Sequence, residues 1–258
     1  MYRPQYRENR EYVPILSRKE IEDIAERYVC DFQPAVIRDC VPLDIESFIE
    51  CYLGMNQDYQ YLSHNGIYLG MTVFNDTDKV PVYDPRTNRA EYVHVDANTV
   101  IIDRWLYEDE NQKHRYRFTL GHEGGHGIFH TKHFYRDPNQ MSFLETDDAP
   151  VIRCRKDMER TKPNPRLWTD QDRMEWQANA FASSLLMPRT AVRNLFRTYD
   201  HCGRTEQVCC AIKDIVNNLD VSQSAAVYRL KDLGLLAQED VEKFLPGSAF
   251  LDFMDFAI

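Results

Sequence analysis

The chain lacks long apolar runs. No uninterrupted apolar stretch approaches the roughly 18 residues of a membrane-spanning helix. Residues 1–7 are polar and contain no apolar core of the kind found in signal peptides. We therefore expect a cytoplasmic protein that does not enter a membrane.

An excess of basic residues is also missing. Lys and Arg number 31 against 41 Asp and Glu, so the formal net charge is −10. Proteins whose main affinity is for nucleic acid need a basic surface that contacts phosphates. The charge disfavours that class of protein, although it is compatible with a local basic patch.

The cysteines follow no metal-binding or disulfide pattern. They number seven, which is odd, and no Cys-x-x-Cys occurs. A disulfide framework and a cysteine-rich zinc site are therefore disfavoured, and we expect reduced thiols. Internal repeats are absent too, and 258 residues suffice for one large domain or two smaller ones.

The N-terminal half mixes helical and strand-like patterns after an irregular arm over residues 1–16. Ser17 and Glu20 form a capping box that predicts a helix over residues 17–31, and a second helix is predicted over residues 44–52, ended by Gly54. β-Branched and aromatic segments then predict a small, mainly antiparallel sheet. Its strands are residues 59–62, 67–74, 80–83 and 99–103, with a turn over residues 84–88.

The C-terminal half is predicted to be helical. The expected helices are residues 111–130, a helix opened by Thr169 and Asp172 and ended before Pro188, residues 189–199, and at least two more within residues 204–258. Residues 131–168 show little periodicity and are either a solvated loop or a segment that shapes a substrate site. We predict a first domain over residues 1–200 and a helical C-terminal region over residues 201–258.

One short motif, His122-Glu123-Gly124-Gly125-His126, has the form His-Glu-x-x-His. On a helix, side chains four positions apart lie on one face, with Cβ atoms about 5–6 Å apart, so both histidines can reach one ion. Glu123 projects about 100° away from His122 around the helix. It can lie beside the ion without binding it and accept a proton from the attacking water, as in metallopeptidases.

Glycines surround this motif at Gly121, Gly124, Gly125 and Gly127. Each destabilises a helix interior by about 1 kcal/mol relative to Ala. A purely structural surface helix would gain nothing from them, whereas glycine allows another backbone to approach closely. This context favours a metal site that joins two elements.

A third protein ligand must come from elsewhere in the chain. A His six positions after the second histidine is one known solution, but Lys132 occupies that position. Glu175 is the better candidate, because it lies beside the apolar stripe of a later helix and a carboxylate held there needs a partner. The alternative is an ordinary surface glutamate, in which case His130 or His133 would be the next candidates.

Two motifs together resemble a known family. The first is the His-Glu-x-x-His motif, and the second is Glu175-Trp176-Gln177-Ala178-Asn179-Ala180-Phe181-Ala182, followed by Leu185-Leu186-Met187-Pro188. The pair is similar to that of the ImmA/IrrE family of zinc metallopeptidases, in which the glutamate of Glu-x-x-Ala-Asn-x-Phe-Ala is the third ligand. The resemblance extends over residues 18–200 in the order of elements, but it is close only in the two motif helices. The connection between the motifs is longer here than in the family.

The resemblance implies a zincin-like α+β domain with Zn²⁺ held by His122, His126 and Glu175, and with Glu123 as the general base. It also implies a regulatory protease that cuts one cytoplasmic protein, often a transcriptional repressor. We expect this function, with two alternatives: a DNA-binding or sensor regulator with a non-catalytic metal domain, or a metal-dependent hydrolase of a non-peptide bond.

Four further residues are candidates for the surroundings of the site. His130, one turn beyond His126, either supports the site or simply lies near the end of its helix. The Asn179 carbonyl is a candidate acceptor for a ligand histidine. His133 and Tyr135 are candidate oxyanion donors, although the sequence does not place them.

The C-terminal region resembles a helix-turn-helix unit. Two apolar helical stripes flank the turn Asp220-Val221-Ser222, with Ser222 as a cap, and Gly234 ends the second helix. The basic residues of these helices are balanced by acidic ones. A helical cap or a docking surface for a protein partner is therefore favoured over DNA binding.

Overall fold

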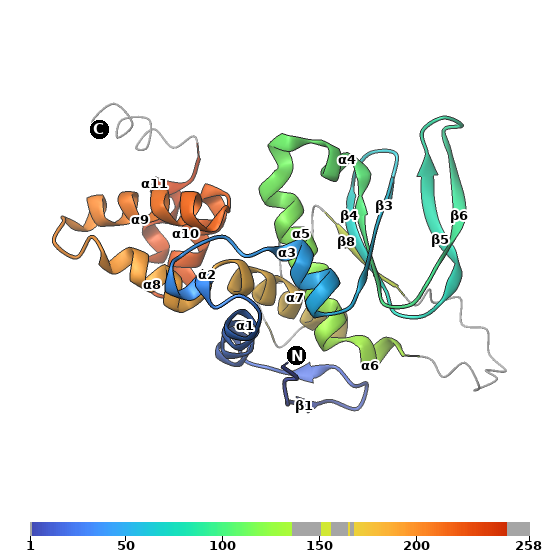
Figure 1. Ribbon diagram of the computed structural model, residues 1–258, viewed down its shortest axis with the longest axis horizontal. Coiled ribbons are helices and arrows are strands. Elements are labelled where there is room, and N and C mark those ends of the chain that lie inside the picture. Colours follow the sequence, from blue (N-terminus) through green and yellow to red (C-terminus); the bar gives the residue numbers. More distant parts are fainter. Residues whose placement is uncertain (1, 136–150, 156–164, 166–167, 247–258) are drawn as a thin grey trace. The chain divides into compact units, whose positions relative to one another are not determined.

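The computed structural model describes residues 2–135, 151–155, 165 and 168–246. It has the predicted α+β architecture (Figure 1). The chain divides into two compact units. Unit 1 comprises residues 3–21 and 45–182, and unit 2 comprises residues 22–44 and 183–258. This division does not follow the domain boundary predicted at residue 200, which stays a prediction.

Unit 1 contains a four-stranded sheet with the order β3-β7-β4-β8. The strands are β3 (Asn56–Gln60), β4 (Tyr68–Val73), β7 (Thr99–Asp103) and β8 (Val151–Arg155). β4 pairs antiparallel with β7 and with β8, but β3 pairs parallel with β7. Three of the four predicted strands overlap β3, β4 and β7, but the predicted strand over residues 80–83 lies outside this sheet. β3 and β7 can pair in parallel because a long segment of the chain, residues 61–98, connects them.

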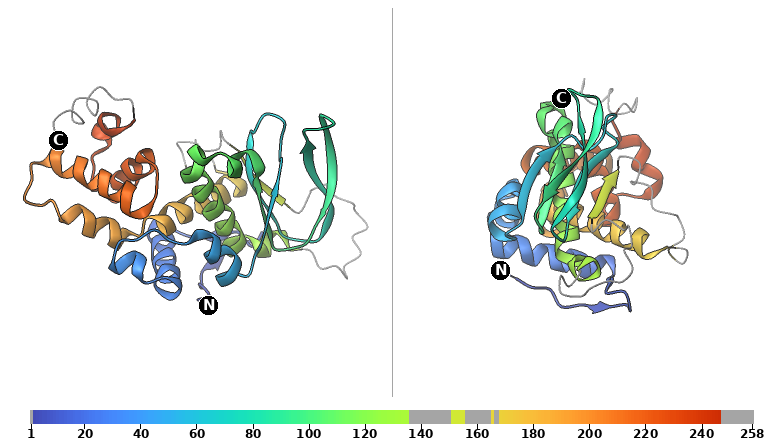
Figure 2. Two further views of the ribbon diagram at one scale, coloured as in Figure 1. Left: turned by 45° about the horizontal axis from the view of Figure 1, so that its top comes forward. Right: turned by 90° about the vertical axis from the view of Figure 1, so that its right-hand side faces the viewer.

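A separate hairpin, β5 (Thr77–Asp84) and β6 (Arg89–Val95), belongs to the same unit and is clearest in Figure 2. The predicted turn joins its strands, and Asn88 adopts a positive φ of 55° there. The prediction missed β6 because most of this strand is exposed and its apolar alternation is short. β8 was missed because it lies within residues 131–168, which show little periodicity in the sequence.

The sheet packs against the motif helix, α5 (Lys113–Phe129). All residues of β7 are buried, as are all of β4 except its first. The predicted helix over residues 111–130 is therefore present, preceded by α4 (Arg104–Glu108) and the 3-10 turn η2 (Glu110–Gln112), and followed by α6 (Thr131–Phe134). These short flanking helices were not predicted.

The structure confirms the helix caps that the sequence predicts at the starts of two helices. Ser17 and Glu20 make the predicted capping box of α1 (Arg18–Phe32), and Thr169 and Asp172 do the same for α7 (Asp170–Leu186). Residues 44–52 form a short turn, α3 (Ile45–Ser47), that continues as a π-helix, η1 (Phe48–Tyr52), and Gly54 follows with a φ of 68°. The arm contains one short hairpin, β1 (Arg7–Glu8) with β2 (Pro14–Ile15).

Unit 2 is helical. Besides the larger part of α1 it contains α2 (Ala35–Arg38), α8 (Arg189–Arg197), α9 (Arg204–Leu219), α10 (Gln223–Asp232), η4 (Gln238–Asp240) and α11 (Val241–Phe244). Asp220, at a φ of 52°, ends α9, and Ser222 caps α10, as the helix-turn-helix pattern predicts. The Arg229 side chain is buried and pairs with Glu22 of α1 at 2.7 Å.

Two further observations concern the cysteines and the helices of the described residues. The six cysteines whose side chains the structure describes are free thiols. Within the described ranges, no helix has both the length and the apolar character needed to cross a membrane.

Candidate metal centre

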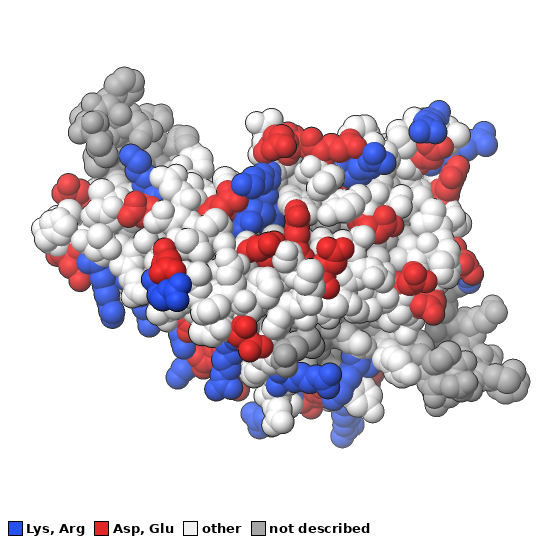
Figure 3. Space-filling model, viewed as in Figure 1, with Lys and Arg blue, Asp and Glu red and all other residues white. Residues whose placement is uncertain are grey.

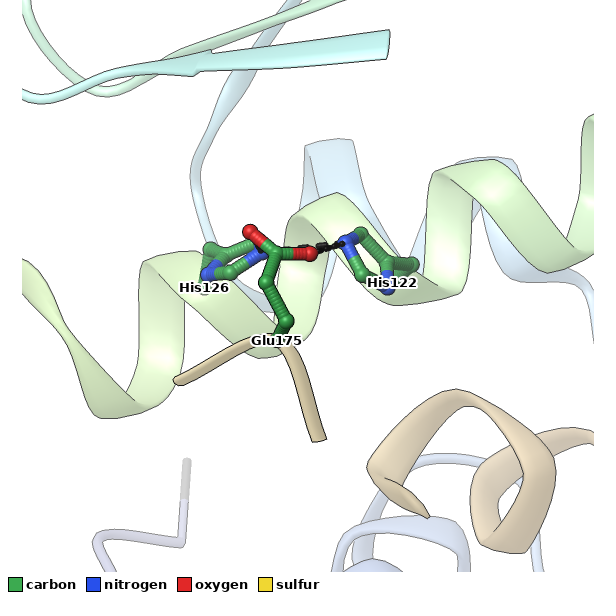
Figure 4. A group of neighbouring side chains, drawn as sticks. All are labelled: His122, His126 and Glu175. Carbon is green, nitrogen blue, oxygen red and sulfur yellow. Dashed lines mark hydrogen bonds and ion pairs between the residues drawn. The ribbon is translucent and has the colours of Figure 1, made fainter. Parts of the chain in front are cut away.

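Two helices of unit 1 bring the predicted ligands together. His122 and His126 lie one turn apart on α5, and their Nε2 atoms are 3.0 Å apart. Glu175 of α7 places Oε2 3.4 Å from His122 Nε2 and Oε1 3.6 Å from His126 Nε2 (Figure 4). Ligand atoms bound tetrahedrally at about 2.0–2.1 Å lie about 3.3 Å from one another. The three side chains are buried and form a group that can hold one metal ion.

Glycines allow α5 and α7 to approach closely enough for this geometry. A Cβ on Gly125 would lie 3.3 Å from the Cα of Ala178, and one on Gly121 would lie 3.6 Å from the Cα of Ala182. The predicted backbone approach is therefore present at these two positions. Gly124 and Gly127 are covered instead by the side chains of Ile49 and Met55.

Glu123 is fully buried beside the ligands and is held by strand β4. Thr72 Oγ1 donates to Glu123 Oε2 at 2.6 Å, whereas Oε1 has no hydrogen-bond partner among the described residues. Gly70 leaves room for this carboxylate, because a Cβ there would lie 2.8 Å from Oε1. One carboxylate oxygen of Glu123 is thus held by a hydrogen bond, and the other has no hydrogen-bond partner among the described residues. This arrangement is suited to accepting a proton.

Burial sets the ionisation of Glu123. It raises the pKa of this carboxyl group to about 7, although His122 and the hydrogen bond from Thr72 act in the opposite direction. General bases work best with a pKa near the operating pH. The environment of Glu123 is therefore that of a general base at neutral pH.

The candidate ligands carry the charges that a metal ion requires. Burial lowers the pKa of His126, although Glu175 opposes this effect, and the neutral imidazole is the form that binds metal. Burial alone would raise the pKa of Glu175, but His126 and His122 outweigh it and hold that pKa well below its usual range. The two histidines therefore favour the carboxylate form of Glu175, which is the form that binds metal.

The residues fit a divalent metal ion. Both carboxylate oxygens of Glu175 are buried and have no hydrogen-bond partner among the described residues. A buried charge is stable only if it is paired or binds a metal. Two imidazoles and one carboxylate are also a donor set found in catalytic zinc sites, where the fourth position is left open.

A comparison with protein families agrees with this geometry. Residues 156–231 match the model of peptidase family M78, described as the IrrE N-terminal-like domain. The match supports membership of the ImmA/IrrE family over this segment of the chain. The match includes Glu175 and Asn179 but not the His-Glu-x-x-His motif, which is linked to it by the geometry of the site. No curated protein matches the chain.

In this IrrE-like chain, two of the four additional candidates contact the ligands. Asn179 Oδ1 lies 2.9 Å from His122 Nδ1, and His130 Nδ1 lies 2.9 Å from His126 Nδ1. The other two contact neither ligand among the described interactions: His133 Nδ1 lies 2.6 Å from the backbone oxygen of Glu11, and Tyr135 is 59% exposed. Their role as oxyanion donors stays a prediction without support from these contacts.

Sequence reasoning missed three residues that hold the site in place. Gly70 and Thr72 lie on β4, and Gln177 lies on α7, where it contacts His130. No local pattern marks the strand residues, since their partner Glu123 is about fifty positions away in sequence. Gln177 could have been suspected, because it lies two residues after a ligand and is polar on a largely apolar helix.

Proposed function

We propose that this protein is a zinc-dependent endopeptidase. The observation that carries the proposal is that Glu123 Oε1, which has no hydrogen-bond partner among the described residues, lies beside the buried group His122, His126 and Glu175. A peptidase family match over the segment that contains Glu175 supports the same activity.

The chain supplies the ligands and the base. Zn²⁺, when bound by the three ligands, would act as a Lewis acid that lowers the pKa of water and polarises a carbonyl group. Glu123 Oε1 takes a proton from the attacking water as the new C–O bond forms. The C–N bond then breaks, and Glu123 passes this proton to the leaving amine. Thr72 keeps the other carboxylate oxygen oriented throughout.

For the substrate, we propose one specific cytoplasmic protein, such as a transcriptional regulator. This part of the proposal rests on the resemblance to the ImmA/IrrE family. It would make the protein a regulatory protease with a narrow choice of substrate, so general protease substrates such as casein are poor tests of activity.

The DNA-binding alternative has less support. In the helix-turn-helix-like segment, Arg229 is buried against Glu22, and Lys231 lies 3.6 Å from Asp232. Over the face displayed in Figure 3, basic side chains lie among acidic ones. A gel-shift experiment at low and at ordinary salt distinguishes the two functions, because electrostatic DNA binding weakens steeply with salt.

Glu123→Gln tests the peptidase proposal. The amide keeps the shape of the side chain but cannot accept a proton at neutral pH. Wild type and variant, both loaded with zinc, are incubated with a cytoplasmic extract, and new protein N-termini are identified by mass spectrometry. We expect discrete new N-termini with wild type and a rate lower by about 10²–10⁴-fold with the variant.

Glu206→Gln, an exposed change on α9, is the matched control and should cleave as wild type does. Equal cleavage by Glu123→Gln and wild type would contradict the general-base role. If the wild type produces no new N-termini but hydrolyses a non-peptide ester or amide, and Glu123→Gln does so far more slowly, the non-peptide alternative is favoured instead.

A further inference from the structure

A chain of hydrogen bonds runs from His126 through the interior of unit 1. His126 Nδ1 and His130 Nδ1 are 2.9 Å apart, and His130 Nε2 lies 2.9 Å from Gln177 Oε1. Gln177 Nε2 donates to the backbone oxygen of Pro14 at 2.6 Å. His126 and His130 are fully buried and Gln177 is 2% exposed, so water does not compete for these bonds.

The last group of the chain determines where every proton lies. A backbone carbonyl can only accept, so the Gln177 amide nitrogen faces Pro14 and its oxygen faces His130. The reverse orientation would place two oxygens 2.6 Å apart. His130 must therefore carry its proton on Nε2, which leaves Nδ1 as an acceptor for the proton of His126 Nδ1. His126 is left with a lone pair on Nε2, the atom nearest Glu175.

A second contact gives His122 the same tautomer. Its Nδ1 lies 2.9 Å from Asn179 Oδ1, so the proton is on Nδ1 and Nε2 carries a lone pair. The two Nε2 atoms are only 3.0 Å apart. In these tautomers no proton lies between them, so the pair attracts a cation.

We propose that His130 and Gln177 are positioning residues that fix His126 in its metal-binding tautomer, with the N-terminal arm as the anchor at Pro14. This inference rests on the proposed metal site. Neither residue is a ligand; both act through His126.

The arm is attached firmly enough to serve as an anchor. Asn9 Nδ2 donates to Asp170 Oδ1 at 3.1 Å, which ties the arm to the start of α7. Tyr6 donates to the backbone oxygen of Ile128 at 3.3 Å, and His133 contacts the backbone oxygen of Glu11. The arm that carries the Pro14 carbonyl is therefore attached to α5, α6 and α7.

Three variants test the proposal through zinc affinity, measured by competition with a chromophoric chelator. Gln177→Leu and His130→Leu break the chain. His130→Gln preserves its polarity, because an amide offers one acceptor and one donor, as the neutral imidazole does. We expect the leucine variants to bind Zn²⁺ about 10–100-fold more weakly, the usual effect of losing a partner of a ligand histidine. His130→Gln should recover most of the affinity.

The imidazole ¹⁵N resonances of the wild-type protein test the same proposal without a variant. We expect His126 to be protonated on Nδ1 and His130 on Nε2, both with and without Zn²⁺. A mixture of tautomers, or equal zinc affinity for wild type and both leucine variants, would overturn the positioning role. If the wild-type protein itself binds no Zn²⁺, the proposed zinc peptidase function fails. If the wild type binds Zn²⁺ but the leucine variants bind it equally well, only the positioning role fails.

Discussion

At the scale of single residues, the site depends on a few positions where a substitution should impair metal binding or cleavage. Glu175 is the clearest case, because its carboxyl group is buried and neither carboxyl oxygen has a hydrogen-bond partner among the described residues. An ion that binds all three ligands removes the cost of this burial. Purified wild-type protein should therefore contain about one zinc per chain, given one three-ligand group.

Glu175→Ala should lower the zinc content strongly, because two histidines alone leave the ion with too few protein ligands. Elemental analysis of protein purified without chelator measures the effect. Glu206→Ala, on the exposed face of α9, is the control and should retain the metal. Full zinc content in Glu175→Ala would reject this residue as a ligand.

Gly70 is a second such position, because any side chain there would collide with its neighbours. Its missing side chain leaves room for Glu123 Oε1 and for Thr119 Cγ2, each 2.8 Å from where a Cβ would lie. Gly70→Ala should displace the base and reduce cleavage by about 10²-fold, the order of loss expected for a misplacement of about 1 Å. Zinc content should stay unchanged, since the ligands are on other elements. Gly203→Ala, where nothing lies within 4 Å, is the control, and equal cleavage rates for the two variants would contradict this account.

At the scale of elements, the site depends on how closely α5 packs against α7. The two glycines at this contact differ in the space they leave. An added Cβ at Gly121 meets the Cβ of Ala182 at 3.5 Å, an ordinary contact, whereas at Gly125 it meets the ring of Phe181 at 3.2 Å and the Ala178 backbone at 3.3 Å.

Gly121→Ala and Gly125→Ala should therefore differ in stability. Alanine improves helix propensity by about 1 kcal/mol at both sites. At Gly125 this gain is offset by overpacking, which typically costs about 1–3 kcal/mol. We expect Gly121→Ala to be at least as stable as wild type in urea unfolding, and Gly125→Ala to be less stable than Gly121→Ala and weaker in zinc binding. Equal stability of the two variants would show that α7 shifts away from the added Cβ at residue 125 without a loss of stability.

At the scale of the whole molecule, the metal group lies within unit 1. All three ligands belong to that unit, on α5 and on the part of α7 that it contains. The helices α9 and α10 belong to unit 2 and supply none of them. The metal should therefore stabilise one part of the protein more than the other.

Removal of the metal with a chelator should accelerate amide hydrogen exchange in α5 and in residues 170–182 of α7. A ligand that binds only the folded state stabilises that state, so its loss lowers the free energy of local opening. Exchange in α9 and α10 should change little, which is an internal control. Equal acceleration in both units would show that they unfold as one.

The sequence by itself determined what local chemistry can specify. Helix caps depend on residues three positions apart, and two ligand histidines depend on positions four apart, so Ser17, Thr169, His122 and His126 could be recognised directly. The ligand from the second helix was proposed from its place beside an apolar stripe and from a resemblance to known motifs. β6 was missed because most of the strand is exposed, so the short alternation Val93-His94-Val95 is a weak signal.

Only the tertiary structure decided which distant residues support the site. Thr72 and Gly70 meet Glu123 because β4 packs on α5, and Gln177 meets His130 because α7 crosses the same helix beside the N-terminal arm. These contacts follow from packing between elements far apart in sequence. No spacing along the chain encodes them, whereas the positions of the two ligand histidines follow from a single turn of helix.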